Sequence, residues 1–357
     1  MVATLLGMIG LLAGFLLIWH VRLCPPLQRL DRTSLSVIIP ARNEEHNLPT
    51  LLRSIFSSTS QPTEVLVVDD ASSDGTAAVS ESFGARVLRL SEKPDGWTGK
   101  SWACHQGALQ ARGSLLFFLD ADTYFVDEGF SRTISCWVAN RDRNAVLSIL
   151  PYHAMEAVYE QLSLFFNIMM AAGAGGFGLS SQPRLFGQAL LISKDIYFAA
   201  GGHAAVGGVV LENLRFADLL RRTAARIVCI AGRGALHMRM FPEGSAQMSR
   251  SWAKAFVQGA ADSGGIVLAS AIAWIFVLWS TALMMLLAPH KYGYWPLIIV
   301  YLALSMQIAR QARQLGNYYL ITCLLYPIPL AYYCAIFAQA VVRRAMGKKT
   351  IWRGREV

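Results

Sequence analysis

The chain has 357 residues, of which 54% are hydrophobic and only 15% are charged. Soluble domains usually carry about a quarter charged residues, so this composition argues against a wholly soluble protein and predicts that part of the chain lies in lipid. The formal net charge is +9. Its basic residues gather beside apolar stretches, as Arg343 and Arg344 do, which indicates contact with anionic lipid rather than with nucleic acid.

Four uncharged apolar stretches divide the chain: 1–21, 263–289, 292–309 and 315–342. A membrane-spanning helix needs roughly 20 apolar residues, so the third stretch is marginal and the others are long enough. No cleavage site follows the first stretch, which predicts an uncleaved anchor. Basic residues from Arg22 onward follow this anchor. They favour a multi-pass protein of the plasma membrane whose central block lies in the cytoplasm.

Short apolar runs rich in β-branched residues predict four buried strands, at 35–40, 64–70, 86–90 and 114–119. Helical patterns and polar turns separate these runs. Alternating strands and helices predict an α/β fold, with a mainly parallel, Rossmann-like sheet and helices on both faces. In such sheets the ligand lies beyond the carboxyl ends of the strands.

Acidic residues follow three of the predicted strands. Glu44 comes after the first, Asp69 and Asp70 end the second, and Asp120 and Asp122 follow the fourth. Each could be an ordinary turn or helix-cap residue. Three such clusters at one edge would repel one another unless a cation or hydrogen-bond donors compensate them. The pattern therefore predicts a cation-dependent site at the carboxyl edge of the sheet.

The order of these segments resembles the family 2 glycosyltransferases with a GT-A fold. The resemblance rests on P-x-R-N-E-E, V-V-D-D-x-S-x-D-G-T and F-L-D-A-D, and it covers roughly residues 35–260. The segments G-W-T-G-K-S-W-A at 96–103 and L-P-Y-H at 150–153 also resemble glycosyltransferases of the bacterial C30 carotenoid pathway, which esterify a diapocarotenoid acid with glucose. Hopanoid-associated glycosyltransferases are similar too.

The resemblance implies that Asp120 and Asp122 form a D-x-D motif. In the family this motif holds a divalent metal that bridges the two phosphates of the donor, and oxygen ligands suit Mg²⁺ or Mn²⁺. Asp122 is therefore a predicted catalytic residue, because it would hold this metal. The resemblance also implies a pocket for a UDP-sugar donor, lined by Pro40, Arg42, Glu44, Asp69 and Asp70.

Two further residues take roles from the same resemblance. Lys100 opens a predicted helix, where a lysine and free backbone N–H groups can meet a diphosphate; the alternative is a surface lysine. Family members carry an acidic pair whose Asp is the catalytic base, but this chain has Glu212 followed by Asn213. Glu212 is therefore the candidate base, or else a helix-cap carboxylate. A carboxylic acid acceptor, already ionised at pH 7, needs a base less than an alcohol does.

These observations predict an enzyme, a hexosyltransferase that moves a sugar, with glucose the best guess, from a UDP-sugar to a lipid-like acceptor with inversion. A carotenoid carboxylic acid is the preferred acceptor. The alternatives are a hopanoid, sterol-like or sphingoid lipid alcohol, or a membrane scaffold with a decayed transferase domain. The predicted parts are an anchor and juxtamembrane segment (1–32), a GT-A domain (33–247), an interfacial amphipathic helix (248–264), a transmembrane region (265–342) and a basic tail (343–357).

The number of membrane crossings stays open. Three full crossings after a cytoplasmic domain would leave the basic tail outside, against the positive-inside tendency. Either the short stretch 292–309 or the stretch 315–342, which contains Pro327 and Pro329, is then not a simple crossing.

Overall fold

The computed structural model describes residues 2–27, 33–141, 144–178, 183–209, 212–259, 265–287, 295–346, 351–352 and 355–356. The chain forms two compact units. The sheet unit comprises Val21–His153 and Gln182–Arg239, and the helical unit comprises Met1–His20, Ala154–Ser181 and Met240–Val357. The segment Ala154–Ser181, which lies inside the predicted GT-A domain 33–247, thus belongs to the helical unit.

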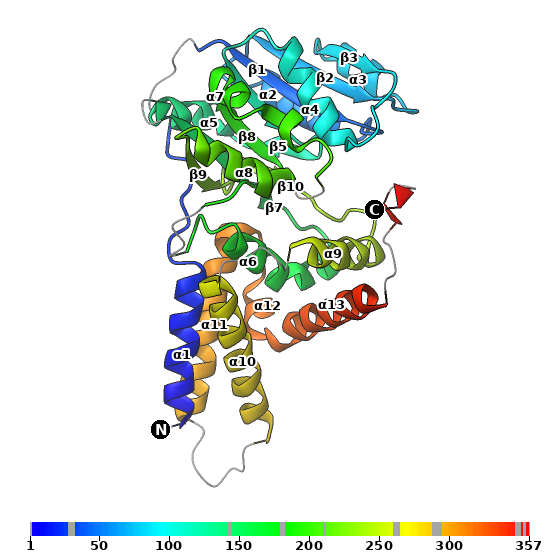
Figure 1. Ribbon diagram of the computed structural model, residues 1–357. Coiled ribbons are helices and arrows are strands. Elements are labelled where there is room, and N and C mark those ends of the chain that lie inside the picture. The colour runs from blue at the N-terminus through cyan, green and yellow to red at the C-terminus, as the bar shows by residue number, and fades with distance from the viewer. Residues whose placement is uncertain are drawn as a thin grey trace. The chain divides into compact units, whose positions relative to one another are not determined.

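The sheet unit is built on a seven-stranded sheet with the order β3-β2-β1-β4-β8-β6-β9 (Figure 1). Strand β8 is antiparallel to β4 and β6, and the other pairings are parallel. This confirms the predicted mainly parallel α/β sheet. The strands are β1 (Leu35–Ala41), β2 (Glu64–Asp70), β3 (Arg86–Leu90), β4 (Leu115–Leu119), β6 (Ala145–Leu150), β8 (Ala189–Ser193) and β9 (Arg226–Ala231).

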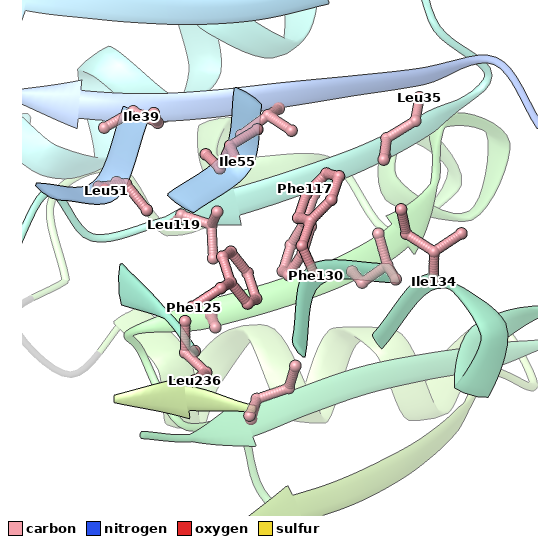
Figure 2. Packing of buried hydrophobic residues seen from close by; sticks show 14 of the residues in the cluster. Leu35, Ile39, Leu51, Ile55, Phe117, Leu119, Phe125, Phe130, Ile134 and Leu236 are labelled. Carbon is pink, nitrogen blue, oxygen red and sulfur yellow. The ribbon is translucent and has the colours of Figure 1, made fainter. Parts of the chain in front are cut away.

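The two faces of this sheet carry alternate residues of each strand. One face presents Ile39, Phe117 and Leu119 to α2 (Leu48–Phe56) and α5 (Gly129–Val138), and Figure 2 shows this core. On the other face Ile38 packs under Gly107 of α4 (Gly99–Gln110), and the ring of Phe118 stacks on that of Tyr197. Burial on both faces explains why these strands read as continuous apolar runs.

Further elements complete the sheet unit. The opposite face is flanked by α4 (Gly99–Gln110), α7 (Lys194–Ala199), η3 (Gly202–Val206) and α8 (Glu212–Arg222), while α3 (Thr76–Ser82) joins β2 to β3. A three-stranded sheet follows β4, with the order β5-β10-β7: β5 (Thr123–Phe125), β10 (Leu236–Met238) and β7 (Tyr152–His153). Its Phe125 and Leu236 join the core in Figure 2.

In the helical unit α1 (Val2–Leu17), α10 (Gly265–Leu287) and α11 (Trp295–Leu315) lie side by side (Figure 1). Glycines of α1 permit this close approach: a Cβ at Gly10 would lie 2.6 Å from Val277 Cγ1, and one at Gly14 would lie 2.3 Å from Gln307 Oε1. Small residues allow helix backbones to come together in apolar surroundings. The other elements are η2 (Val158–Ser163), α6 (Leu164–Gly173), α9 (Ser245–Gly259), α12 (Leu320–Leu324), α13 (Pro327–Ala345), β11 (Ile351–Trp352) and β12 (Arg355–Glu356).

Two glutamines of α11 hydrogen-bond to backbone carbonyls of α1. The Gln307 amide donates to the Leu11 carbonyl (2.7 Å) and accepts from the Trp274 indole (3.1 Å), and Gln311 donates to the Gly14 carbonyl (2.8 Å). A buried amide is costly unless it is hydrogen-bonded. These contacts therefore fix α1 in one register against α11, and the Trp274 bond joins α10 to the same glutamine.

The predicted apolar stretches correspond to helices of unequal length. Within the described part of the chain, α10 is the one helix long and apolar enough to cross a membrane, judged by length and composition, and α1 is shorter. The stretch 315–342 is interrupted, because α12 ends at Leu324 and α13 begins at Pro327. Proline is suited to the first position of a helix, where its missing N–H costs nothing. The segment 248–264, predicted to be an interfacial helix, is helical as far as Gly259 as part of α9, which begins at Ser245, and residues 260–264 lie outside the described residues.

Glu64 offers a test of the sheet unit away from the carboxyl edge. Its carboxylate accepts from Ser36 Oγ (2.7 Å) and Arg86 Nη1 (2.9 Å), and from the backbone N–H of Arg112. Burial alone would raise the Glu64 pKa, but these donors outweigh it and hold the pKa below its ordinary 4.5. We expect Glu64→Gln to lower the free energy of unfolding by about 1–3 kcal/mol at pH 7, since the amide presents donors to donors.

The pH dependence provides the check. A carboxylate with a depressed pKa stabilises the fold above its unfolded pKa, and this contribution is lost as the pH falls through the folded pKa. The difference between wild type and Glu64→Gln in thermal or urea unfolding should therefore shrink as the pH drops below 4.5. Glu81→Gln is the control, because its ion pair with Arg89 is exposed. An equal loss of stability in both variants would contradict the assignment.

Candidate active site

The carboxyl ends of β2, β1 and β4 are neighbours, because these strands are adjacent and parallel. This arrangement brings the predicted site residues to one edge of the sheet unit. Pro40 lies within β1 and pairs with Val68, and Arg42 follows the strand. Arg42 Nη1 is 3.6 Å from Asp70 Oδ2 at the end of β2.

The turns after β1 and β2 are tied together by reciprocal hydrogen bonds. The backbone N–H of Glu44 donates to Thr76 Oγ1 (2.8 Å), and the Ser73 N–H donates to Asn43 Oδ1 (2.8 Å). Asp69 Oδ1 accepts from the backbone N–H of Ser72 (3.0 Å). Asp69 therefore shapes the turn after β2, as Asx-type turns do. Asp70, one residue further, is left to face Arg42.

Lys100 links α4 to the end of β4. Its Nζ lies 2.5 Å from Asp120 Oδ1 and donates to the Gly187 carbonyl (2.9 Å). Burial alone would lower the Lys100 pKa, but the negative charges of Asp120 and Glu212 raise it above its ordinary value. The ammonium is thus held in its charged form between two carboxylates.

Asp122 lies in a different electrostatic setting. Burial, followed by the negative charges of Asp120 and Glu44, raises the pKa of Asp122 to about 7. Its Oδ1 is buried and has no hydrogen-bond partner within the described residues. An unpaired buried carboxylate oxygen among like charges fits a hard divalent cation. The described residues contain no group of three or more His, Cys, Asp or Glu side chains that could hold a metal, so Asp120 and Asp122 would leave most of the coordination shell to a ligand and water.

Glu212, the first residue of α8, is held by α4. Its Oε2 accepts from Ser101 Oγ (2.9 Å) and Thr98 Oγ1 (3.4 Å). Burial raises the Glu212 pKa, while the charge of Lys100 and these hydroxyls oppose the rise. Asn213 next to it crowds Gly187, where a Cβ would lie 2.3 Å from Asn213 Nδ2.

Several residues of this site were not anticipated from the sequence. Thr98 caps α4 by accepting from the Ser101 N–H (3.2 Å), and both hydroxyls also bind Glu212. Threonine is a favoured residue immediately before a helix, so this cap could have been predicted from the sequence. No local sequence pattern indicates the role of the Gly187 carbonyl or the lack of room for a Cβ at Gly99, because the partners of both lie far away in the chain.

Comparison with known proteins defines the class. Residues 36–207 match the family described as Glycosyl transferase family 2. A mannosyltransferase from Pyrobaculum calidifontis, solved in complex with GDP-Man and Mn²⁺, shares the fold with a TM-score of 0.57, at 16% identity over 97% of this chain and 99% of its own. The chain carries a family 2 glycosyltransferase domain of the GT-A type, and it is an enzyme.

Curated relatives extend the similarity over nearly the whole chain. The 4,4'-diaponeurosporenoate glycosyltransferases of Staphylococcus aureus strains MRSA252 and bovine RF122 / ET3-1 are each 28% identical in an alignment of 333 positions, which covers 91% of this chain and 88% of theirs. The similarity therefore includes both units and not the sheet unit alone.

Gly99 provides a test of the site's geometry. A Cβ at Gly99 would lie 2.5 Å from Asp70 Oδ2, although alanine is favoured over glycine in a helix. We expect Gly99→Ala to keep or raise the melting temperature while it displaces the Asp70 carboxylate and lowers transfer from a labelled nucleotide sugar about tenfold, the effect of about 1.4 kcal/mol.

Gly173→Ala is the matched control. Gly173 also lies in a helix, and a Cβ there would meet no described atom within 4 Å. Its activity should equal that of the wild type. Unchanged activity of Gly99→Ala, with the protein folded, would show that the position of Asp70 does not matter for transfer.

Proposed function

We propose that this enzyme transfers glucose from UDP-glucose, with inversion, to a carotenoid carboxylic acid dissolved in the membrane. One observation carries the site assignment: Asp122 has an unpaired, buried carboxylate oxygen next to the Lys100–Asp120 pair at the carboxyl edge of the sheet. The acceptor class is supported by the names of the relatives that match over 91% of the chain. The UDP donor and the glucose rest on the motif resemblance and on the acidic turn at Asp70.

The residues of the candidate active site suit a donor that contains a diphosphate. Asp120 and Asp122 would hold Mg²⁺ or Mn²⁺, which when bound supplies positive charge to the leaving diphosphate. Lys100 adds a second cation in the first turn of α4, where backbone N–H groups also favour anions. Pro40, Arg42, Glu44, Asp69 and Asp70 would line the nucleotide end.

The acceptor chemistry follows from Glu212. A carboxylate oxygen of the acceptor attacks the anomeric carbon, the bond from that carbon to the diphosphate oxygen breaks, and UDP leaves with the electron pair. A carboxylate brings no proton to remove at pH 7. The Glu212 carboxylate is already engaged by Ser101 and Thr98, which suits a residue that orients the acceptor and positions α4. An alcohol acceptor, as in a hopanoid, sterol-like or sphingoid lipid, would require Glu212 to act as the base.

An acceptor panel tests this proposal. Membranes containing the full chain, supplied with labelled UDP-glucose and Mn²⁺, should glucosylate a carotenoid carboxylic acid and leave the corresponding carotenoid alcohol unchanged, as judged by product mass. We expect Asp122→Asn to reduce the rate by at least about 100-fold, because transition-state charge loses its compensation. Asp218→Asn, an exposed position on α8, is the control. If sugar is transferred only to the alcohol or only to a hopanoid, the carotenoid acid is not the acceptor.

We also propose that the helical unit anchors the enzyme in the plasma membrane and that the sheet unit lies in the cytoplasm. Apolar side chains of its helices are exposed to the surroundings, with relative exposures of 61% at Ile272 and 63% at Phe276 of α10. Large exposed apolar surfaces mark contacts with membranes or partners. Arg22 follows α1 in the chain and favours the cytoplasmic side.

Charge placed on α10 tests the membrane assignment. The double change Ile272→Asp and Phe276→Asp should remove most of the protein from the carbonate-washed membrane fraction, because a central Asp in a spanning helix costs about 2.5–3.5 kcal/mol on insertion scales. The control is Leu109→Asp, which alters a leucine of α4 in the sheet unit that is also exposed (50%). If the double variant partitions like the wild type, α10 is not in lipid.

A further inference from the structure

Gln188 stands directly beside the aspartates and has no role in the site described so far. Its carbonyl accepts from the Asp120 N–H (2.9 Å). Strands β4 and β8 are antiparallel with Leu119 opposite Ala189, so the same register places Gln188 opposite Asp120. Directly opposed residues of an antiparallel pair direct their side chains to the same face. The Gln188 side chain thus shares the face of the Asp120 carboxylate, which Lys100 contacts.

The amide oxygen of Gln188 is unsatisfied. It is buried and has no hydrogen-bond partner in the described part of the chain. The two backbone carbonyls at this point are engaged, since the Gly187 carbonyl accepts from Lys100 and the Gln188 carbonyl accepts from Asp120. Buried polar atoms in native proteins are nearly always paired. An unpaired acceptor in an otherwise well-bonded turn indicates a hydrogen-bond donor that arrives with the ligand.

The chemistry of the amide separates the parts of a nucleotide sugar. Phosphate oxygens are acceptors and cannot pair with Gln188 Oε1, whereas Lys100 and backbone N–H groups can serve them. A divalent cation is better served by the charged oxygens of Asp120 and Asp122. The remaining groups near a diphosphate are the hydroxyls of the ribose on one side and of the transferred sugar on the other, and a hydroxyl both donates and accepts, as an amide does.

We propose that Gln188 hydrogen-bonds a hydroxyl of the transferred hexose and so takes part in selecting the donor sugar. This assignment rests on the proposed function, because it requires a nucleotide sugar at Asp120 and Asp122. A site built to pair with a hydroxyl discriminates strongly against an analogue that lacks it, since its own polar group is then left unpaired.

A double-mutant cycle tests the assignment. The purified full-length chain and Gln188→Met, an apolar replacement of similar length, are titrated in Mn²⁺ with UDP, UDP-glucose and the 2-, 3-, 4- and 6-deoxyglucose analogues of UDP-glucose. We expect Gln188→Met to weaken UDP-glucose binding about tenfold and UDP binding by less than about twofold. One deoxy analogue should bind the wild type about tenfold more weakly than UDP-glucose does, yet bind Gln188→Met as well as UDP-glucose does. Gln110→Met, at the far end of α4, should match the wild type.

The possible outcomes are distinct. Equal weakening of UDP and UDP-glucose in Gln188→Met, or full binding of every deoxy analogue by the wild type, would overturn the role of Gln188 and leave the proposed function intact. Full binding of every deoxy analogue by the wild type overturns this role even if Gln188→Met does not fold, and Gln188→Ala then replaces Gln188→Met in the cycle. A wild type that binds neither UDP nor UDP-glucose would refute the proposed function together with this inference.

Discussion

The ion pair between Lys100 and Asp120 is the contact on which the site depends. Parallel strands deliver Asp70 and Asp120 to one edge, and like charges at such an edge would otherwise push the turns apart. Lys100 compensates part of this charge from the first turn of α4, and its second bond fixes the Gly187 carbonyl. One ammonium group therefore joins the end of β4, the start of β8 and the start of α4, which are distant in the sequence.

Lys100 compensates the negative charge of Asp120 but not that of Asp122. Asp120 is neutralised by Lys100, whereas Asp122 is held among negative charges with its pKa raised to about 7. Additional positive charge beside Asp122 would therefore favour its ionised form. In a turn that served only the fold, a neutral residue in place of Asp122 would avoid the cost of burying a carboxylate among negative charges.

The helical unit follows a different physical rule. Two buried amides of α11, Gln307 and Gln311, donate to backbone carbonyls of α1, while apolar side chains of α10 lie both inside the bundle and on its surface. A bundle in water would turn charged residues outward, whereas one in lipid has no reason to. Gly10 and Gly14 let α1 pack closely against its neighbouring helices, and in the proposed lipid surroundings such packing would take the place of the hydrophobic effect.

The sequence by itself determined the α/β class, the first four strands in the chain and the edge of the sheet at which the acidic residues meet. These follow from local patterns: β-branched apolar runs, turn residues and the rule that parallel strands place their carboxyl ends together. The apolar stretches were equally readable, although the break between α12 and α13 shows that hydropathy alone cannot tell one long helix from two shorter ones.

Only the tertiary structure decided which groups pair. Nothing local links Glu212 to Ser101, Lys100 to the Gly187 carbonyl, or Gln188 to Asp120, since each contact joins segments about 70 to more than 100 residues apart. The sequence likewise gave no sign that Ala154–Ser181 packs with the helical unit. Such contacts depend on how β8 inserts between β4 and β6 and on how helices pack around glycines, and these are properties of the assembled fold rather than of any segment within it.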